Sequence, residues 1–173
     1  MDRKILFRGQ TRRYGQKVKM NGEKLPGNWV YGGVLQGKGD FSIIYGGENP
    51  GDMEKHVVYT DTLGQYTGLT DKNGKKIFEG DIVRYNDQMG FDIHSTVKIG
   101  KYDQDGSGGE YRAAECVGVY FEVLDFTRPD WGEEWGVNPQ ECNNTVSPLD
   151  NDVIETEVIG NIHDGKDDKK HDD

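Results

Sequence analysis

The chain has 173 residues, of which 33% are hydrophobic and 30% charged, and its mean hydropathy of -0.84 is strongly polar. This length fits one domain or two small domains that share a core. No apolar run approaches the ~20 residues that a membrane-spanning helix needs. Only Ile5 to Phe7 separate the first charged residues from Arg8, which is not the pattern of a signal peptide. These features exclude the common membrane classes and predict a cytoplasmic protein with a small core.

The charge is unevenly distributed. Residues 1–38 hold nine Lys and Arg against two Asp and Glu, a net of +7, whereas the remainder nets -17 out of the total of -10. Such asymmetry is typical of an N-terminal region that faces nucleic acid. It is equally consistent with two faces that attract each other across an oligomer interface, or with solvated surface charge.

The 25 glycines and the 10% aromatic content favour short strands joined by tight turns. The two cysteines, Cys116 and Cys142, form no Cys-x-x-Cys pair. We therefore expect free thiols in a reducing compartment.

Short strands and loops are predicted for the N-terminal part, residues 1–60. The apolar runs predict strands at Lys4–Arg8, Trp29–Leu35, Phe41–Tyr45 and His56–Tyr59. Asn21-Gly22 is a hairpin signal, and Gly32-Gly33 indicates a bulge or a close approach of two backbones.

The stretch from Thr60 to Tyr85 organises the rest of the chain. Asn73-Gly74 is the residue pair that tolerates positive φ at both centres of a two-residue hairpin loop. Leu69-Thr70 and Ile77-Phe78 flank it as paired strands, and a new strand begins at Ile82.

Three further strands are predicted downstream. Residues 95–99 alternate at period two, residues 113–126 form the longest strand region with a bend at Gly118, and residues 153–162 form the last strand. A helix is the alternative for residues 113–126. Residues 127–151 are predicted as a long loop, and the charged tail at 164–173 as disordered.

Four segments carry a resemblance to a known family. They are QYTGLTDKNGKKIFEGDIV at 65–83, ILFRG at 5–9, GNWVYG at 27–32 and VIGNIHD at 158–164. In this order the chain resembles the YopX-like proteins of phages and prophages.

The resemblance implies a mainly β protein. It implies that the C-terminal part is a small β-barrel of the SH3 type. We expect an N-terminal strand-and-loop part over residues 1–60, packed on this barrel over residues 61–163. The resemblance also implies a phage or prophage origin and a bacterial cytoplasmic setting. It supplies no established activity and no catalytic residues.

Two regions are candidates for binding a partner. Trp131 and Trp135 stand in the motif WGEEW, where they could form an interface or ligand platform, or could cap the core. The second candidate is basic and is interleaved with aromatic residues that could stack on bases. Its cations are Arg8, Arg12, Arg13, Lys17 and Lys19.

No catalytic residue, cofactor or metal site is predicted. The four histidines are far apart in sequence, and none has metal-ligand spacing with a cysteine. Glu79 and Asp81 flank Gly80 and could share acid–base work, but acids in such a turn more often bind local amides. Asp103 to Gly106 begins like a calcium loop, yet its glycine comes too early.

These observations favour a non-catalytic accessory protein that acts through protein–protein contacts and self-associates as a homo-oligomer. A host or phage protein is a further candidate partner. The first alternative is a nucleic-acid-binding protein that uses the basic N-terminal region. The others are a metal-dependent or hydrolytic enzyme, and an acidic body that imitates nucleic acid.

Overall fold

The structure is a computed structural model that describes residues 5–11, 28–46, 54–87, 90–104, 114–127, 145–148 and 154–164. These residues form β-strands and one short 3-10 helix, so the prediction of a mainly β protein is confirmed. None of them belongs to a helix that is long and apolar enough to cross a membrane. The chain divides into two compact units, Met1–Tyr66 with His163–Asp173, and Thr67–Ile162.

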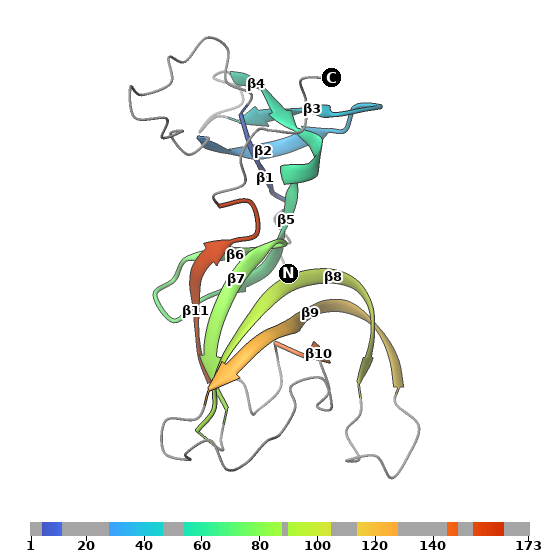
Figure 1. Cartoon of the computed structure of the whole chain (residues 1–173). Coiled ribbons are helices and arrows are strands. Elements are labelled where there is room, and N and C mark those ends of the chain that lie inside the picture. Colours follow the sequence, from blue (N-terminus) through green and yellow to red (C-terminus); the bar gives the residue numbers. More distant parts are fainter. Residues whose placement is uncertain are drawn as a thin grey trace, which may run out of the picture. The chain divides into compact units, whose positions relative to one another are not determined.

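The first unit contains four complete strands and the start of a fifth (Figure 1). Its elements are β1 (Phe7–Gln10), β2 (Trp29–Leu35), β3 (Phe41–Gly46), β4 (Glu54–Tyr59), the 3-10 helix η1 (Thr60–Thr62) and the first residues of β5 (Gly64–Thr70). Together with β6 they give the strand order β4-β3-β2-β1-β5-β6. The pairings among β1 to β5 are antiparallel.

The core of the first unit is small and lies on one face of this sheet. Ile44 and Val58 are fully buried, and a Cβ on Gly9 would lie 3.1 Å from Val58. An isolated bridge joins Thr11 to Val58, so the sheet curls until the end of β1 meets β4. Glycine at position 9 eases this close approach, because an added Cβ would crowd the side chains of Val58 and Ile44.

The predicted close approach of two backbones occurs at Gly32, where β2 meets β3. A Cβ at this position would lie 1.9 Å from the carbonyl oxygen of Tyr45 in β3. Nothing lies within 4 Å of a Cβ placed on the neighbouring Gly33. Only the first of the two glycines is therefore required by space.

The second unit is a five-stranded antiparallel sheet with the β5–β6 hairpin. Its strands are β6 (Lys76–Phe78), β7 (Asp81–Asn86), β8 (Asp92–Gln104), β9 (Ala114–Thr127), β10 (Thr145–Val146) and β11 (Ile154–Asn161). The sheet order is β10-β9-β8-β7-β11. Its core consists of Ile77, Val83, Tyr85, Val97, Phe121 and Val158.

The long β8–β9 hairpin bends strongly (Figure 1). Thr145 of β10 pairs with Glu122, yet its hydroxyl also donates to the carbonyl oxygen of Asp103 at 2.7 Å, although Asp103 pairs with Glu115 further along β9. A straight hairpin could not bring these groups together. The described strands nevertheless form open sheets, with β10 paired to β9 and β11 paired to β7, so the expected SH3-type barrel is not confirmed.

The hairpin loop at Asn73-Gly74 differs from the prediction. Gly74 has a φ of +78°, but Asn73 is not among the described residues with positive φ. The amide of Gly74 donates to the Asp71 carbonyl, and the amide of Asp71 donates to the Lys75 carbonyl, so three residues form the loop instead of two. The Asp71 carboxylate stabilises this longer loop because it accepts from the amides of Asn73 and Lys75 at 2.8 and 2.9 Å.

The predicted strands at Trp29–Leu35, Phe41–Tyr45, His56–Tyr59 and residues 95–99 are confirmed, and residues 113–126 are represented by β9 and not by a helix. The Asn21-Gly22 hairpin, most of the predicted loop at 127–151 and the tail at 165–173 lie outside the described residues.

Candidate interaction face

The strands β2, β3 and β4 are apolar on both sides of the sheet. On the inner side, Ser42, Ile44 and Val58 are buried. Successive side chains of a strand point to opposite faces, so the alternate residues lie on the other side. We call this side the outer face; its apolar and aromatic members are Tyr31, Leu35, Phe41, Ile43, Tyr45, Val57 and Tyr59.

The centre of the outer face is a row of aliphatic side chains in register. Leu35 pairs with Ile43, and Ile43 pairs with Val57. Leu35 is 57% exposed and Val57 is 40% exposed. Directly paired residues have Cβ atoms about 5 Å apart, so the three side chains form one continuous strip across the sheet.

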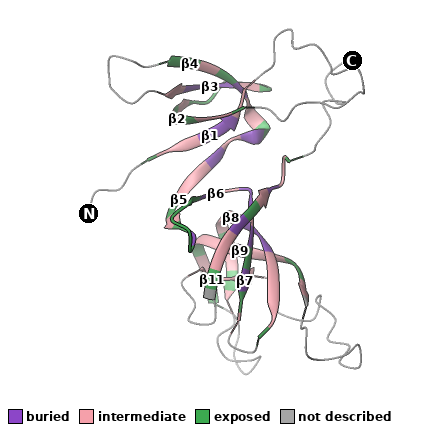
Figure 2. Ribbon diagram, turned by 90° about the vertical axis from the view of Figure 1, so that its left-hand side faces the viewer, coloured by how far each residue is buried: buried purple, intermediate pink, exposed green. Residues whose placement is uncertain are grey.

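Aromatic rings extend this strip along the strands. Phe41 pairs with Tyr59, and their ring centroids lie 5.4 Å apart. Tyr45 lies on the opposite side of the central row from Phe41, and it pairs with Gly33 of β2 and Lys55 of β4. Exposed residues alternate with more buried ones along β2 and β4 (Figure 2).

This pattern is unusual for a sheet with a single core. An antiparallel sheet that faces water on one side has polar residues there, whereas strands that are apolar on both sides are typical of sheets covered on both faces. Contiguous exposed apolar groups mark binding surfaces. The outer face is therefore the best candidate for a functional surface among the described residues.

Of the predicted partner-binding residues, the structure describes Arg8. It lies on β1, is 5% exposed, and its guanidinium carbon stands 4.6 Å from the centre of the Trp29 ring. Cation–π contact and burial give this side chain a role in packing β1 against β2. The other candidates lie outside the described residues: Arg12, Arg13, Lys17, Lys19, Trp131 and Trp135.

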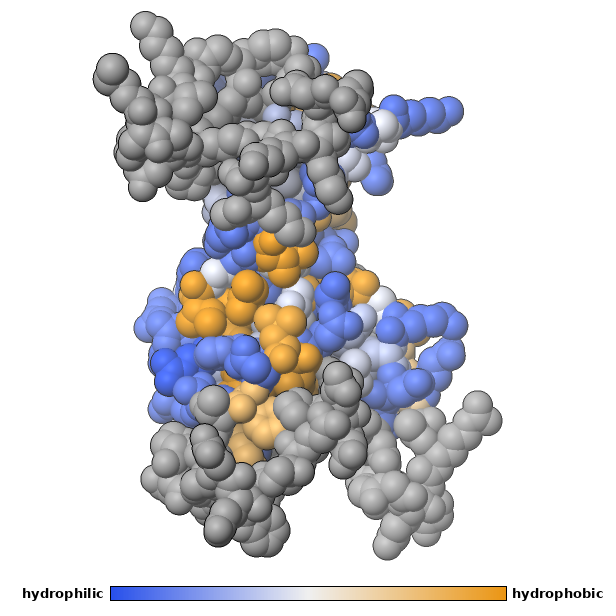
Figure 3. All heavy atoms as spheres, viewed as in Figure 1, coloured by the Kyte–Doolittle hydropathy of each residue, from blue (hydrophilic) through white to orange (hydrophobic). Residues whose placement is uncertain are grey.

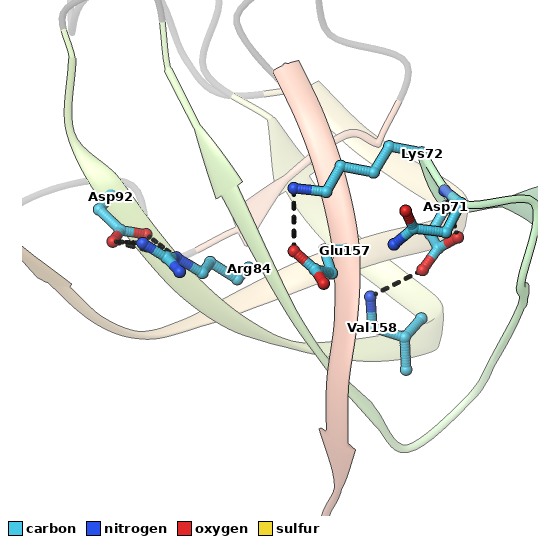
Figure 4. A network of polar contacts seen from close by, with 7 residues as sticks. Asp71, Lys72, Arg84, Asp92, Glu157 and Val158 are labelled. Atoms are coloured by element: carbon cyan, nitrogen blue, oxygen red, sulfur yellow. Dashed lines mark hydrogen bonds and ion pairs between the residues drawn. The ribbon is translucent and has the colours of Figure 1, made fainter.

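The acids of the second unit take part in structural contacts (Figure 4). The Asp71 carboxylate accepts from the Val158 amide at 3.1 Å, and the Lys72 amide donates to the Thr156 carbonyl at 2.8 Å. These two groups of β11 face away from β7. Asp71 and Lys72 thus occupy the outward edge of β11 much as a neighbouring strand would.

Hydrogen bonding sets the charge state of Asp71. Burial raises the pKa of this carboxyl, but the amides of Val158, Lys75 and Asn73 donate to it, and the net result is a lowered pKa. The carboxylate is therefore held ionised by backbone donors.

Asp81, one of the two acids beside Gly80, is 1% exposed and accepts from the Phe78 amide at 2.8 Å. Gly80 has a φ of +81°, and its carbonyl accepts from the Ile162 amide at 3.0 Å. These contacts favour the structural interpretation of Asp81, in which it holds the turn before β7.

Charged side chains also cross the solvent side of the five-stranded sheet. Arg84 binds Asp92 through two nitrogens, with the shortest distance 2.6 Å (Figure 4). Lys72 pairs with Glu157 at 2.9 Å, and Nδ1 of His94 lies 2.8 Å from Asp125. Within the described part of the chain, no three His, Cys, Asp or Glu side chains are grouped so that they could hold a metal ion.

Apolar side chains are also exposed in the second unit. Figure 3 shows hydrophobic groups gathered side by side on the face in view and bordered by hydrophilic ones. Ile159 and Leu124 are 48% and 51% exposed. Each lies at a shift in strand register. Ile159 lies between Val158 and Gly160 in β11, and Leu124 lies in β9 opposite the shift between His94 and Ser95 in β8. β-Bulges redirect side chains, so these two positions are explained locally.

A family model described as YopX protein matches residues 35–166, which is more than half of the chain. The chain belongs to the YopX family. The predicted resemblance to this family is thereby confirmed, and the segments at 65–83 and 158–164 lie within the matched range. The same range contains the central row of the outer face and the whole second unit. The search of curated proteins gave no match to this YopX-family chain, and the search of solved structures gave none either.

The outer face of β2, β3 and β4 was not predicted from the sequence. The signal was present in FSIIY and HVVY, where apolar residues occupy both parities of a strand. The pairing of Leu35, Ile43 and Val57 in one row depends on register, which short strands do not reveal by themselves.

Proposed function

We propose that this YopX-family chain is a non-catalytic accessory protein that acts through protein–protein contacts and self-associates through the outer face of β2, β3 and β4. We extend the proposal to a phage- or prophage-encoded protein that works in the cytoplasm of a bacterial host. The setting is taken from the family resemblance.

The observation that carries the proposal is the aliphatic row Leu35, Ile43 and Val57 on the side of the sheet opposite the core. Fully burying one such side chain contributes roughly 1.5–3 kcal/mol. A second apolar surface that covers the row would recover this free energy, whereas water does not.

Asp81, one of the two acids weighed for acid–base work, gives weaker support to an enzymatic alternative. It is buried, and its carboxylate accepts a hydrogen bond from the Phe78 amide. A general base must be available to a substrate proton. The Asp81 carboxylate instead holds the turn before β7.

The test is light scattering coupled to size exclusion over a wide range of protein concentration. We expect the wild-type mass to rise with concentration. Val57→Glu and Leu35→Glu place a charge in the row at exposed positions where folding is preserved, and both should abolish the rise. Val117→Glu is the matched control, because Val117 is 76% exposed but belongs to the second unit. A wild-type protein that stays monomeric throughout would refute self-association.

A second candidate function is nucleic-acid binding through the basic N-terminal region, favoured by the net charge of +7 over residues 1–38. Binding to labelled DNA or RNA should then weaken steeply with salt. Charge reversal at Arg12, Arg13, Lys17 and Lys19 should abolish it. Retained binding in that variant would exclude this region as the site.

A further inference from the structure

We draw no further inference here: the strongest candidate, the outer face of β2, β3 and β4 around Leu35, Ile43 and Val57, belongs to the site already described, and nothing in the described part of the chain shows what covers it, because the exposed Glu54 and Lys55 at its edge offset each other's charge.

Discussion

The Asp71 carboxylate accepts a hydrogen bond from the Val158 amide at 3.1 Å, across a sequence separation of 87 residues. This contact joins two of the segments that carry the family resemblance, residues 65–83 and residues 158–164. The Lys72 amide and the Thr156 carbonyl add a second bond beside it. The hairpin loop thus closes the outward edge of β11, an edge that would otherwise be available for pairing with another chain.

Loss of the Asp71 carboxylate should strongly destabilise the second unit. Asp71→Ala leaves the buried Val158 amide without its acceptor and removes two further acceptor contacts within the loop. Hydrogen bonds to charged groups contribute about 1.5–3 kcal/mol each, and a buried unsatisfied amide costs a similar amount. We expect the free energy of unfolding to fall by about 2–4 kcal/mol, measured by urea denaturation.

Asp87 offers the matched control for this prediction. Its carboxylate accepts from the Phe91 amide at 2.8 Å within a single short hairpin. Asp87→Ala should cost about 1 kcal/mol, because it removes one local contact. Equal losses in the two variants would contradict the role of Asp71 in tying β11 to the loop.

Stability should fall in acid, with Asp71 as one cause. Its pKa in the folded protein lies below the ordinary value of 3.8, so the folded state favours the ionised form. The stabilisation is complete above the ordinary pKa and is lost as the pH falls through the lowered value. Urea midpoints between pH 7 and pH 2 should therefore drop less steeply below pH 4 for Asp71→Asn than for wild type. Parallel acid profiles would show that Asp71 does not contribute.

Gly32 and Gly33 should respond in opposite ways to the same added methyl group. Gly32→Ala puts a Cβ 1.9 Å from the Tyr45 carbonyl oxygen, and backbone at both sites must then shift. Gly33→Ala meets nothing within 4 Å. Overpacking of this kind costs about 3 kcal/mol or more, whereas Ala at an open strand position is neutral or slightly stabilising. Thermal unfolding of the two variants measures the difference, and a tolerated Gly32→Ala would mean that β2 and β3 are further apart.

The strands were predictable because their apolar runs are short and bounded by turn residues. The run FSIIY at β3 and the alternation at 95–99 identified their strands directly. Long-range contacts were not predictable in the same way. Asp71 reaches Val158 through a carboxylate, and Arg8 packs on Trp29 because β1 and β2 pair in one particular register. The loop at Asn73-Gly74 shows the intermediate case: the turn residues were identified, but the side chain of Asp71 selected a three-residue loop over a two-residue one.

Salt should distinguish the exposed ion pair of Arg84 and Asp92 from the buried contacts of Asp71. Hydrogen bonding from Arg84 lowers the pKa of Asp92, but the Arg84 side chain is 53% exposed. Exposed pairs contribute at most about 1 kcal/mol and are screened by salt. Arg84→Ala should therefore lower the free energy of unfolding slightly at low salt and by almost nothing in 1 M NaCl. Asp71→Ala should cost nearly the same at both salt concentrations, because its donors are backbone amides that salt does not screen. An Arg84→Ala loss that persists in high salt would show that packing of the arginine stem, and not its charge, stabilises the sheet.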